Sequence, residues 1–74
     1  MSSWTLEVES AEYGLIPTMN VTAVSKCGRV ERFAVSLWPA GWRILQRDLN
    51  IPASVRREAI QLAKQLAGHW WGLT

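Results

Sequence analysis

Few side chains in this 74-residue sequence could carry out catalytic chemistry. His69 is the single histidine and Cys27 the single cysteine. A histidine that acts as a general base needs a nucleophile or an orienting carboxylate within reach, and none stands at a recognisable catalytic spacing from His69. The basic neighbours Lys26 and Arg29 can activate the Cys27 thiol, but a cysteine in a turn is more often unreactive. We therefore expect no catalytic residue and no enzymatic activity.

Metal and cofactor sites are equally poorly supported. One cysteine and one histidine cannot form a metal cluster. The five glycines are dispersed along the chain, so the sequence contains no glycine-rich phosphate loop. Glu7 and Glu9 share a strand face, as two catalytic carboxylates would, but a solvated outer face accounts for them equally well. We expect no metal and no cofactor.

The chemistry that the sequence favours is binding, and it centres on residues 38–42, Trp-Pro-Ala-Gly-Trp. Tryptophan has a large apolar face with one N–H at its edge, and tryptophan together with arginine is typical of interface hot spots. The chain contains five tryptophans, which the core of a small domain has trouble hiding. We expect Trp38 and Trp42 to close a three-residue hairpin loop as a cross-strand pair on the sheet face away from the helix. The arginines expected around them are Arg32, Arg43 and Arg47.

An alternative buries these two tryptophans inside a single subunit. Proteins rarely leave large apolar patches bare. The rings would then pack on the loop around residues 13–17, or on Trp70 and Trp71, as a second small core.

The elements that must position these side chains are strands joined by short turns. Residues 4–9, 18–25 and 30–38 alternate apolar and polar residues or are rich in β-branched ones, as half-buried strands do. Pro39 suits the first corner of a turn and Gly41 its left-handed position, which favours a fourth strand over 42–47. The apolar spacing of 42–47 also fits a helix. Residues 10–17 read as a loop from which Leu15 and Ile16 fold back on the core.

A C-terminal helix over residues 52–68 is the clearest element. Pro52 fits its first turn and Gly68 is a natural stop. Its apolar stripe consists of Val55, Ala59, Leu62, Ala63, Leu66 and Trp70. The sequence therefore predicts a single α+β domain over residues 1–74, a three- or four-stranded antiparallel β-meander with one C-terminal α-helix packed on one face.

Composition limits the class of protein. An apolar fraction of 49% with 19% charged residues suits a folded globule. A single cysteine allows no internal disulfide, and the first residues do not resemble a signal peptide, so we expect a cytoplasmic protein. No apolar run approaches the length that spans a bilayer, so we expect no membrane partner.

The charge distribution supports a second function. Residues 21–74 contain all eight basic residues against three acidic ones, which is 8 − 3 = +5, whereas residues 1–20 contain no basic residue. The alternative to protein binding is therefore a small nucleic-acid-binding domain. Its contacts would come from Arg29, Arg32, Arg43, Arg47 and Arg56. In outline, such a helix-backed sheet resembles the plant domains that read DNA with a sheet, although a net charge of +2 is modest for that role.

One motif is similar to a known family signature. The run Ser36-Leu37-Trp38-Pro39, then Gly41-Trp42, then a helix that reaches Trp70, resembles the Ser-x-Trp-Pro…Gly-Trp pattern of MbtH-like proteins. The spacer before Gly-Trp is shorter here, and the family's Asn-x-Glu-x-Gln run falls on Val30, Arg32 and Ala34. Members of that family are small activators of adenylation domains in nonribosomal peptide synthetases, and their tryptophans line the partner contact. The resemblance implies that a sheet edge closed by tryptophans can serve as a protein-docking site.

The sequence as a whole favours a small non-catalytic protein-binding module. It would act as an accessory subunit, adaptor or inhibitor and dock on another protein through Trp38, Trp42 and the nearby arginines. A homodimer through the same sheet face is a third use of that surface.

Overall fold

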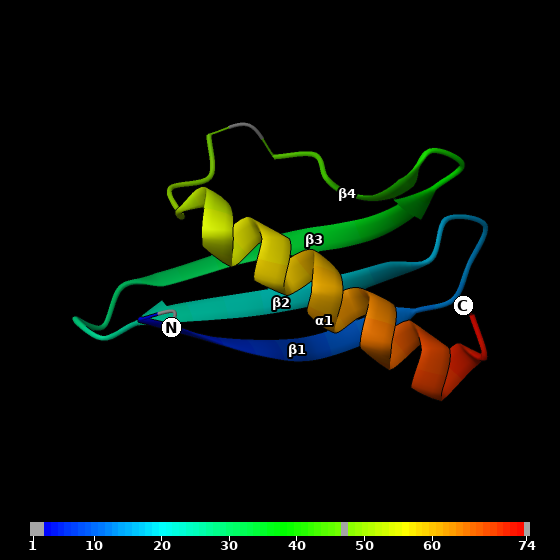
Figure 1. Cartoon of the computed structure of the whole chain (residues 1–74), viewed down its shortest axis with the longest axis horizontal. Helices are drawn as coiled ribbons and strands as arrows, with labels where there is room; N and C mark the ends of the chain where they lie inside the picture. Colours follow the sequence, from blue (N-terminus) through cyan, green and yellow to red (C-terminus); the bar gives the residue numbers. More distant parts are fainter. Residues whose placement is uncertain (1–2, 47, 74) are drawn as a thin grey trace.

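The structure is a computed structural model that describes residues 3–46 and 48–73. Its elements are β1 (Trp4–Glu12), β2 (Thr18–Ser25), β3 (Val30–Trp38), β4 (Gly41–Ile44) and α1 (Ala53–Trp71). The four strands pair antiparallel in the order β1-β2-β3-β4, and α1 crosses one face of the sheet (Figure 1). The predicted α+β meander with one C-terminal helix is confirmed, with the fourth strand present.

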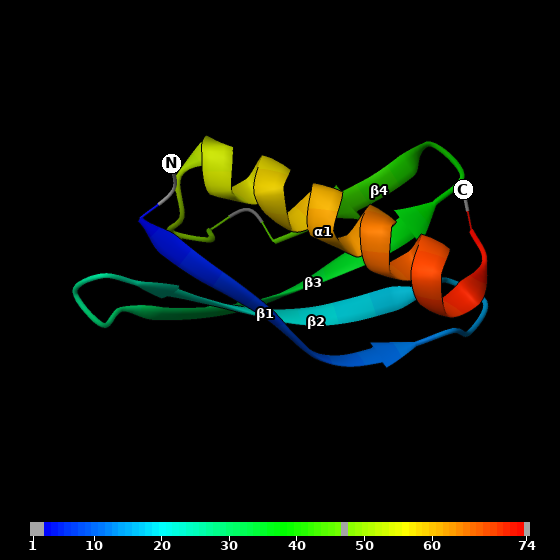
Figure 2. The same cartoon turned by 60° about the horizontal axis from the view of Figure 1, so that its bottom comes forward.

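The core lies between the sheet and α1, and period-two alternation of the strands builds it. Every second residue of β2 and β3 points toward the helix, and the central ones are buried, whereas α1 supplies mainly small side chains. Figure 2 shows the helix lying over this face while the other face of the sheet is uncovered. The buried hydrophobic residues are Met19, Val21, Ala23, Phe33, Val35, Ile51, Val55, Ala59, Ala63 and Ala67. Alanines at Ala59, Ala63 and Ala67 let the helix backbone approach the sheet closely.

Several element boundaries differ from those predicted. β1 continues past residue 9 to Glu12, because a bulge between Val8 and Ser10 lets the strand keep its pairing with β2. β4 ends at Ile44, short of the predicted 47. The predicted stop at Gly68 is wrong, since α1 continues to Trp71. Gly72, with φ of 68°, ends the helix by donating its backbone N–H to the Ala67 carbonyl.

The connection from β4 to α1 is held in place by three side chains. Gln46 Oε1 accepts a hydrogen bond from the Ala34 backbone N–H at 3.2 Å, where a continued β4 would otherwise have paired with β3. Arg56 donates to the Leu49 carbonyl at 2.9 Å, and Arg29 donates to the Asn50 carbonyl at 2.9 Å. The Gln46 bond substitutes for strand pairing on the part of β3 that β4 does not reach, and the two arginine bonds hold the loop that follows.

Candidate protein-binding surface

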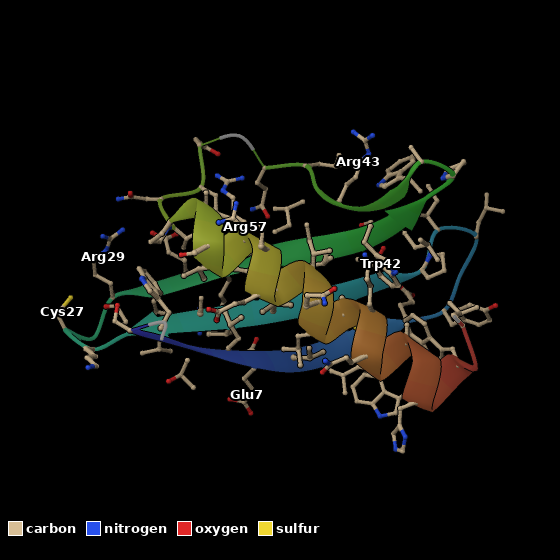
Figure 3. All side chains as sticks on the ribbon, viewed as in Figure 1. Glu7, Cys27, Arg29, Trp42, Arg43 and Arg57 are labelled. Carbon is tan, nitrogen blue, oxygen red and sulfur yellow. The ribbon has the colours of Figure 1, made fainter. Side chains whose placement is uncertain are left out.

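The hairpin between β3 and β4 separates the two central tryptophans. Trp38 pairs with Gly41 and Leu37 pairs with Trp42, so the loop contains two residues, Pro39 and Ala40. The predicted three-residue loop would have placed Trp38 opposite Trp42. A change of one residue in register moves a side chain to the other face of a sheet. Trp42 therefore faces the helix and packs against the core, and the prediction that it shares the outer face with Trp38 is wrong (Figure 3).

Trp38 remains on the face of the sheet that α1 does not cover. Its residue parity is that of Arg32, Ala34 and Ser36, opposite to that of the buried Phe33 and Val35. The side chain is half-buried, and its Nε1 is enclosed without a hydrogen-bond partner among the described residues. Trp38 is therefore not part of the core between the sheet and α1, and its ring is not fully exposed to solvent either.

Of the arginines expected around Trp38, the structure describes Arg32 and Arg43, and only Arg43 lies near it. Arg43 pairs with Ser36 and is the nearest, on the same face and diagonal to Trp38. Arg32 stands six residues away along β3, a separation of about 20 Å in an extended strand. Arg32 lies 4.0 Å from the Glu9 carboxylate, and both side chains are exposed. Arg47 lies outside the described residues, so its expected role stays a prediction.

The arginines of the nucleic-acid alternative are also dispersed. Arg29 and Arg56 donate their hydrogen bonds to the carbonyls of Asn50 and Leu49 and so hold the β4–α1 connection. Arg29 also lies over the Trp4 ring, with the guanidinium carbon 5.6 Å from the ring centroid. By strand parity, the uncovered sheet face carries Glu7 as well as Arg32 and Arg43, so its charge is mixed. No single basic surface joins Arg29, Arg32, Arg43 and Arg56, the four of these arginines that the structure describes.

A different surface collects four of the seven exposed large apolar side chains of the described residues. It comprises Tyr13, Leu15, Ile16 and Trp70, which we call the apolar end. Leu15 is 101% exposed, Tyr13 60%, Trp70 49% and Ile16 36%. The β1–β2 loop, the β3–β4 turn and the C-terminal end of α1 meet at this end of the molecule (Figures 1 and 2).

The prediction that Leu15 and Ile16 fold back on the core is wrong, and the hydrogen bonds at the base of the loop explain why. The Leu37 N–H donates to the Pro17 carbonyl at 2.8 Å, and the Thr18 hydroxyl donates to the Ile16 carbonyl at 3.0 Å. The first bond anchors the base of the loop to β3 and the second fixes the Ile16 carbonyl locally, so the residues before Pro17 project beyond the end of the sheet. The sequence does contain a signal for this exposure, because Tyr13, Leu15 and Ile16 stand in a short loop with Gly14 and Pro17. Hydrophobic periodicity does not detect such a loop.

At the end of α1, Trp71 is the tryptophan that packs on the rest of the molecule, where the sequence predicted Trp70. Trp71 stacks on Tyr13, with ring centroids 5.0 Å apart and an interplanar angle of 30°. Trp70, expected on the buried stripe, is exposed instead. Its neighbour Ala67 is the last fully buried residue of the helix. The tryptophan that stabilises the loop is therefore Trp71, and Trp70 remains available to solvent.

Cys27 lies at the opposite end of the molecule, in the turn between β2 and β3. Its Sγ is 3.1 Å from the Ser25 hydroxyl, and the side chain is exposed. The hydrogen bond from Ser25, with smaller contributions from the Arg29 backbone and charge, lowers the pKa of the Cys27 thiol below its usual value. His69 is exposed in the last turn of α1, where it is the single basic residue.

Comparisons with known proteins give no relative. No protein-family model matches the chain, no curated protein is similar to it, and no solved structure matches its fold. Within residues 3–46 and 48–73, no helix combines the length and the hydropathy needed to cross a bilayer. The same residues contain no group of three or more His, Cys, Asp or Glu side chains placed to hold a metal ion.

Proposed function

We propose that this chain is a non-catalytic protein-binding module, an accessory subunit, adaptor or inhibitor, that docks through the apolar end. The observation that supports this most is the projection of Leu15 into solvent at 101% exposure, in the loop that also carries Tyr13 and Ile16 and at the same end of the molecule as Trp70. Aromatic and aliphatic side chains gathered at one exposed place are typical of protein interfaces. A chain that needed them only for its own stability would have buried them.

Trp38 extends this surface on the side of the uncovered sheet face. Its neighbour Leu37 is bonded to Pro17, and Ser36 Oγ lies 3.2 Å from Thr18 Oγ1, so the β1–β2 loop runs alongside Trp38. Arg43 stands diagonal to Trp38. A central aromatic group with an arginine at its rim is the usual composition of an interface hot spot.

The uncovered sheet face alone is a weaker docking surface. Between its ends it presents hydroxyl, amide and charged groups, such as Thr18, Asn20 and Glu7. An antiparallel sheet with one polar face is stable in water without a partner. The need for a partner is therefore greatest at the apolar end.

The experiment compares two exposed leucines. Immobilised wild-type chain is used to capture partners from the native cell, in parallel with Leu15→Ser and with Leu45→Ser, whose side chain is 59% exposed at the end of β4. We expect one specific protein to be retained by wild type and Leu45→Ser and lost with Leu15→Ser, with the same melting temperature for all three chains. Retention of that protein by Leu15→Ser would contradict the proposal.

Two further results would indicate a different kind of partner for the apolar end. Nucleic acid that is captured at low salt and released at moderate salt would favour the nucleic-acid alternative, because phosphate contacts depend steeply on salt. Sedimentation equilibrium that shows a dimer for wild type and a monomer for Leu15→Ser would make the partner a second copy of the chain.

Trp38→Ala tests the extension of the surface. We expect it to weaken partner binding by about tenfold or more and to lower stability by less than about 1 kcal/mol. A stability loss of several kcal/mol, the size typical of a deleted core aromatic, would show instead that Trp38 acts in packing.

A further inference from the structure

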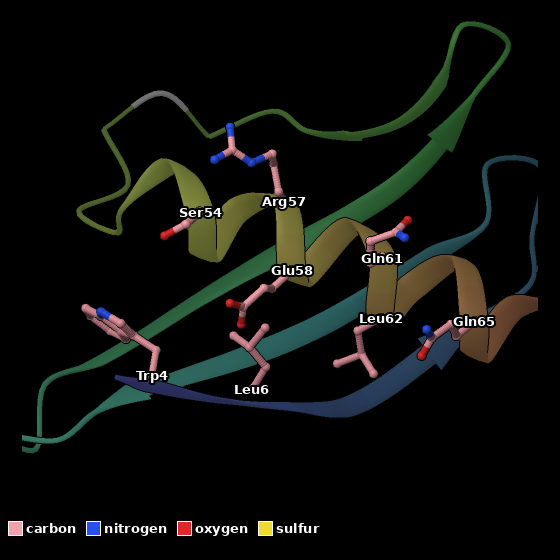
Figure 4. Close-up of a pocket in the computed structure, with 8 residues that line it drawn as sticks. All are labelled: Trp4, Leu6, Ser54, Arg57, Glu58, Gln61, Leu62 and Gln65. Atoms are coloured by element: carbon pink, nitrogen blue, oxygen red, sulfur yellow. The ribbon is translucent and has the colours of Figure 1, made fainter. Parts of the chain in front are cut away.

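An open cleft of about 610 Å³ separates β1 from the first half of α1 (Figure 4). Its apolar lining comes from Trp4 and Leu6 on the strand and Leu62 on the helix. Glu58 and Gln65 of α1 point toward the same space. The cleft lies beside the N-terminal half of β1, away from the apolar end.

The cleft exists because α1 does not cover the sheet evenly. The helix backbone approaches β4 and β3 most closely. The inward residues of β2 are consequently fully buried, whereas the inward residues of β1, Leu6 and Val8, are only half-buried. Apolar surface on β1 therefore remains in contact with solvent along the strand's outer side.

The backbone of β1 is also open on this side. β1 is the edge strand, with β2 as its neighbour in the sheet. The Ser3 carbonyl accepts a hydrogen bond from the Lys26 N–H at 3.1 Å. Bonding in an antiparallel pair alternates along the strand, so Thr5 and Glu7 exchange bonds with β2. The N–H and C=O groups of Leu6 and Val8 consequently point outward, where another strand could pair with them.

The charge of β1 limits which strand could pair there. Glu7 and Glu9 are exposed on the strand, and residues 1–20 contain no basic residue. Among the described residues Glu7 takes part in no ion pair, and Glu9 reaches Arg32 only at 4.0 Å. Like charges opposite one another destabilise a strand pair, and opposite charges stabilise it. A second copy would bring two acidic strands together, so β1 is poorly suited to pair with itself.

We infer that the Trp4–Val8 edge of β1 accepts an extended segment of a partner protein in which apolar and basic residues alternate. The apolar residues lie opposite Leu6 and Val8 and enter the cleft beside Leu62, because paired residues share a face. The basic residues lie opposite Glu7, on the uncovered face. The bulge after Val8 limits regular pairing to this short stretch. This site is separate from the apolar end and from the function proposed for it.

The test uses the full chain and a synthetic nine-residue peptide of alternating valine and lysine with blocked ends. Two matched peptides carry backbone N-methyl groups, one on the valines and one on the lysines, and have the same charge. We expect the valine-methylated peptide to bind at least about tenfold more weakly, since its valines must donate to β1. The lysine-methylated peptide should bind as the parent does, because those N–H groups point away from β1. In NMR spectra, the amide signals of Leu6 and Val8 should shift most.

A charge reversal on the protein provides a second, independent test. Glu7→Lys should weaken binding of the valine–lysine peptide by about tenfold and should favour binding of a peptide with glutamate in place of lysine. Its NMR spectrum away from β1 should match that of the wild type, which shows that the variant is folded. Equal binding of the two methylated peptides, no binding by any peptide at millimolar concentration, or indifference to Glu7→Lys would each overturn the inference. Leu15→Ser should leave peptide binding unchanged, which separates this result from the test of the apolar end.

Discussion

The two edge strands of the sheet, β1 and β4, differ in length and in how the backbone groups beside them are paired. At the β4 edge, the strand ends early, and the Gln46 side chain takes over one of its hydrogen bonds while two arginines hold the connection that follows. Gln46 satisfies the Ala34 N–H, and Arg56 and Arg29 fix the carbonyls of Leu49 and Asn50. At the β1 edge, nine residues run with a bulge and three exposed glutamates, and α1 stands back from the strand. The β4 edge is closed by the chain itself only where Gln46 pairs with β3 beyond Ile44, and the β1 edge is left available.

This difference suggests how a short chain distributes its few stabilising groups. The closed edge carries the connection that positions α1, so opening it would release the helix from the core. The open edge protects itself from self-association by negative charge and a bulge, which are common ways to prevent edge-to-edge aggregation. If the two edges differ in this way, substitutions at the β4 edge should reduce the free energy of unfolding more than substitutions at the β1 edge.

The largest effect is expected from Trp42, which packs against the core from β4. Trp42→Ala should reduce the free energy of unfolding by about 3 kcal/mol, because it deletes a large half-buried ring and the contacts that this ring makes with the core. Urea denaturation followed by circular dichroism measures this. A loss below about 1 kcal/mol would mean that the β4 edge is not anchored through this ring.

Arg56 and Arg57 form a matched pair on the first turns of α1. Arg56 is half-buried and donates to the Leu49 and Gln46 carbonyls, whereas Arg57 is exposed at the rim of the β1 cleft. Arg56→Ala should cost about 1.5 kcal/mol, the size of a lost charge-assisted hydrogen bond. Arg57→Ala should change stability by less than about 0.5 kcal/mol. Equal effects would remove the distinction between the two edges at the helix.

Gln46→Ala should act more locally, because it deletes one acceptor at the closed edge. We expect a loss of about 0.5–1 kcal/mol and faster hydrogen exchange at the Ala34 amide, which loses its partner. Gln61→Ala, on the exposed side of α1, is the control and should leave the Ala34 exchange rate unchanged. Unaltered protection of Ala34 in Gln46→Ala would show that the glutamine does not close this edge.

The smallest effect is expected at the open edge. The Arg32–Glu9 pair is 4.0 Å long, with side chains 73% and 49% exposed. Exposed pairs of this kind contribute little, so Arg32→Ala should change the unfolding free energy by less than about 0.5 kcal/mol. A loss near 2 kcal/mol would mean that the β1 edge contributes to folding as the β4 edge does.

The strands and the helix were predictable because each has a clear hydrophobic period. Alternation marks Trp4–Val8 and Val30–Trp38, and the stripe through Val55, Ala59 and Ala63 marks α1. The side of the sheet that Trp42 occupies was not predictable from the same pattern. Proline followed by Ala-Gly is compatible with a two-residue and a three-residue loop, and the choice between them reverses the side chain.

The candidate surface was only partly accessible to sequence reasoning for a related reason. Trp38 was placed on the correct face from strand parity alone. The exposure of Leu15 and Ile16 depends on hydrogen bonds between Pro17 and Leu37, which join residues twenty positions apart. Likewise, the partners of Arg29 and Arg56 are backbone carbonyls in a loop, and no spacing rule identifies such contacts.

The strict succession of strands has a consequence for how the chain folds. Each strand pairs with the one next to it in sequence, so every pairing closes a short loop. Rates of two-state folding rise as contacts become more local, because less chain entropy is lost before contacts form. We therefore expect a single kinetic phase on the fast side for a sheet protein, with docking of α1 as the one long-range event.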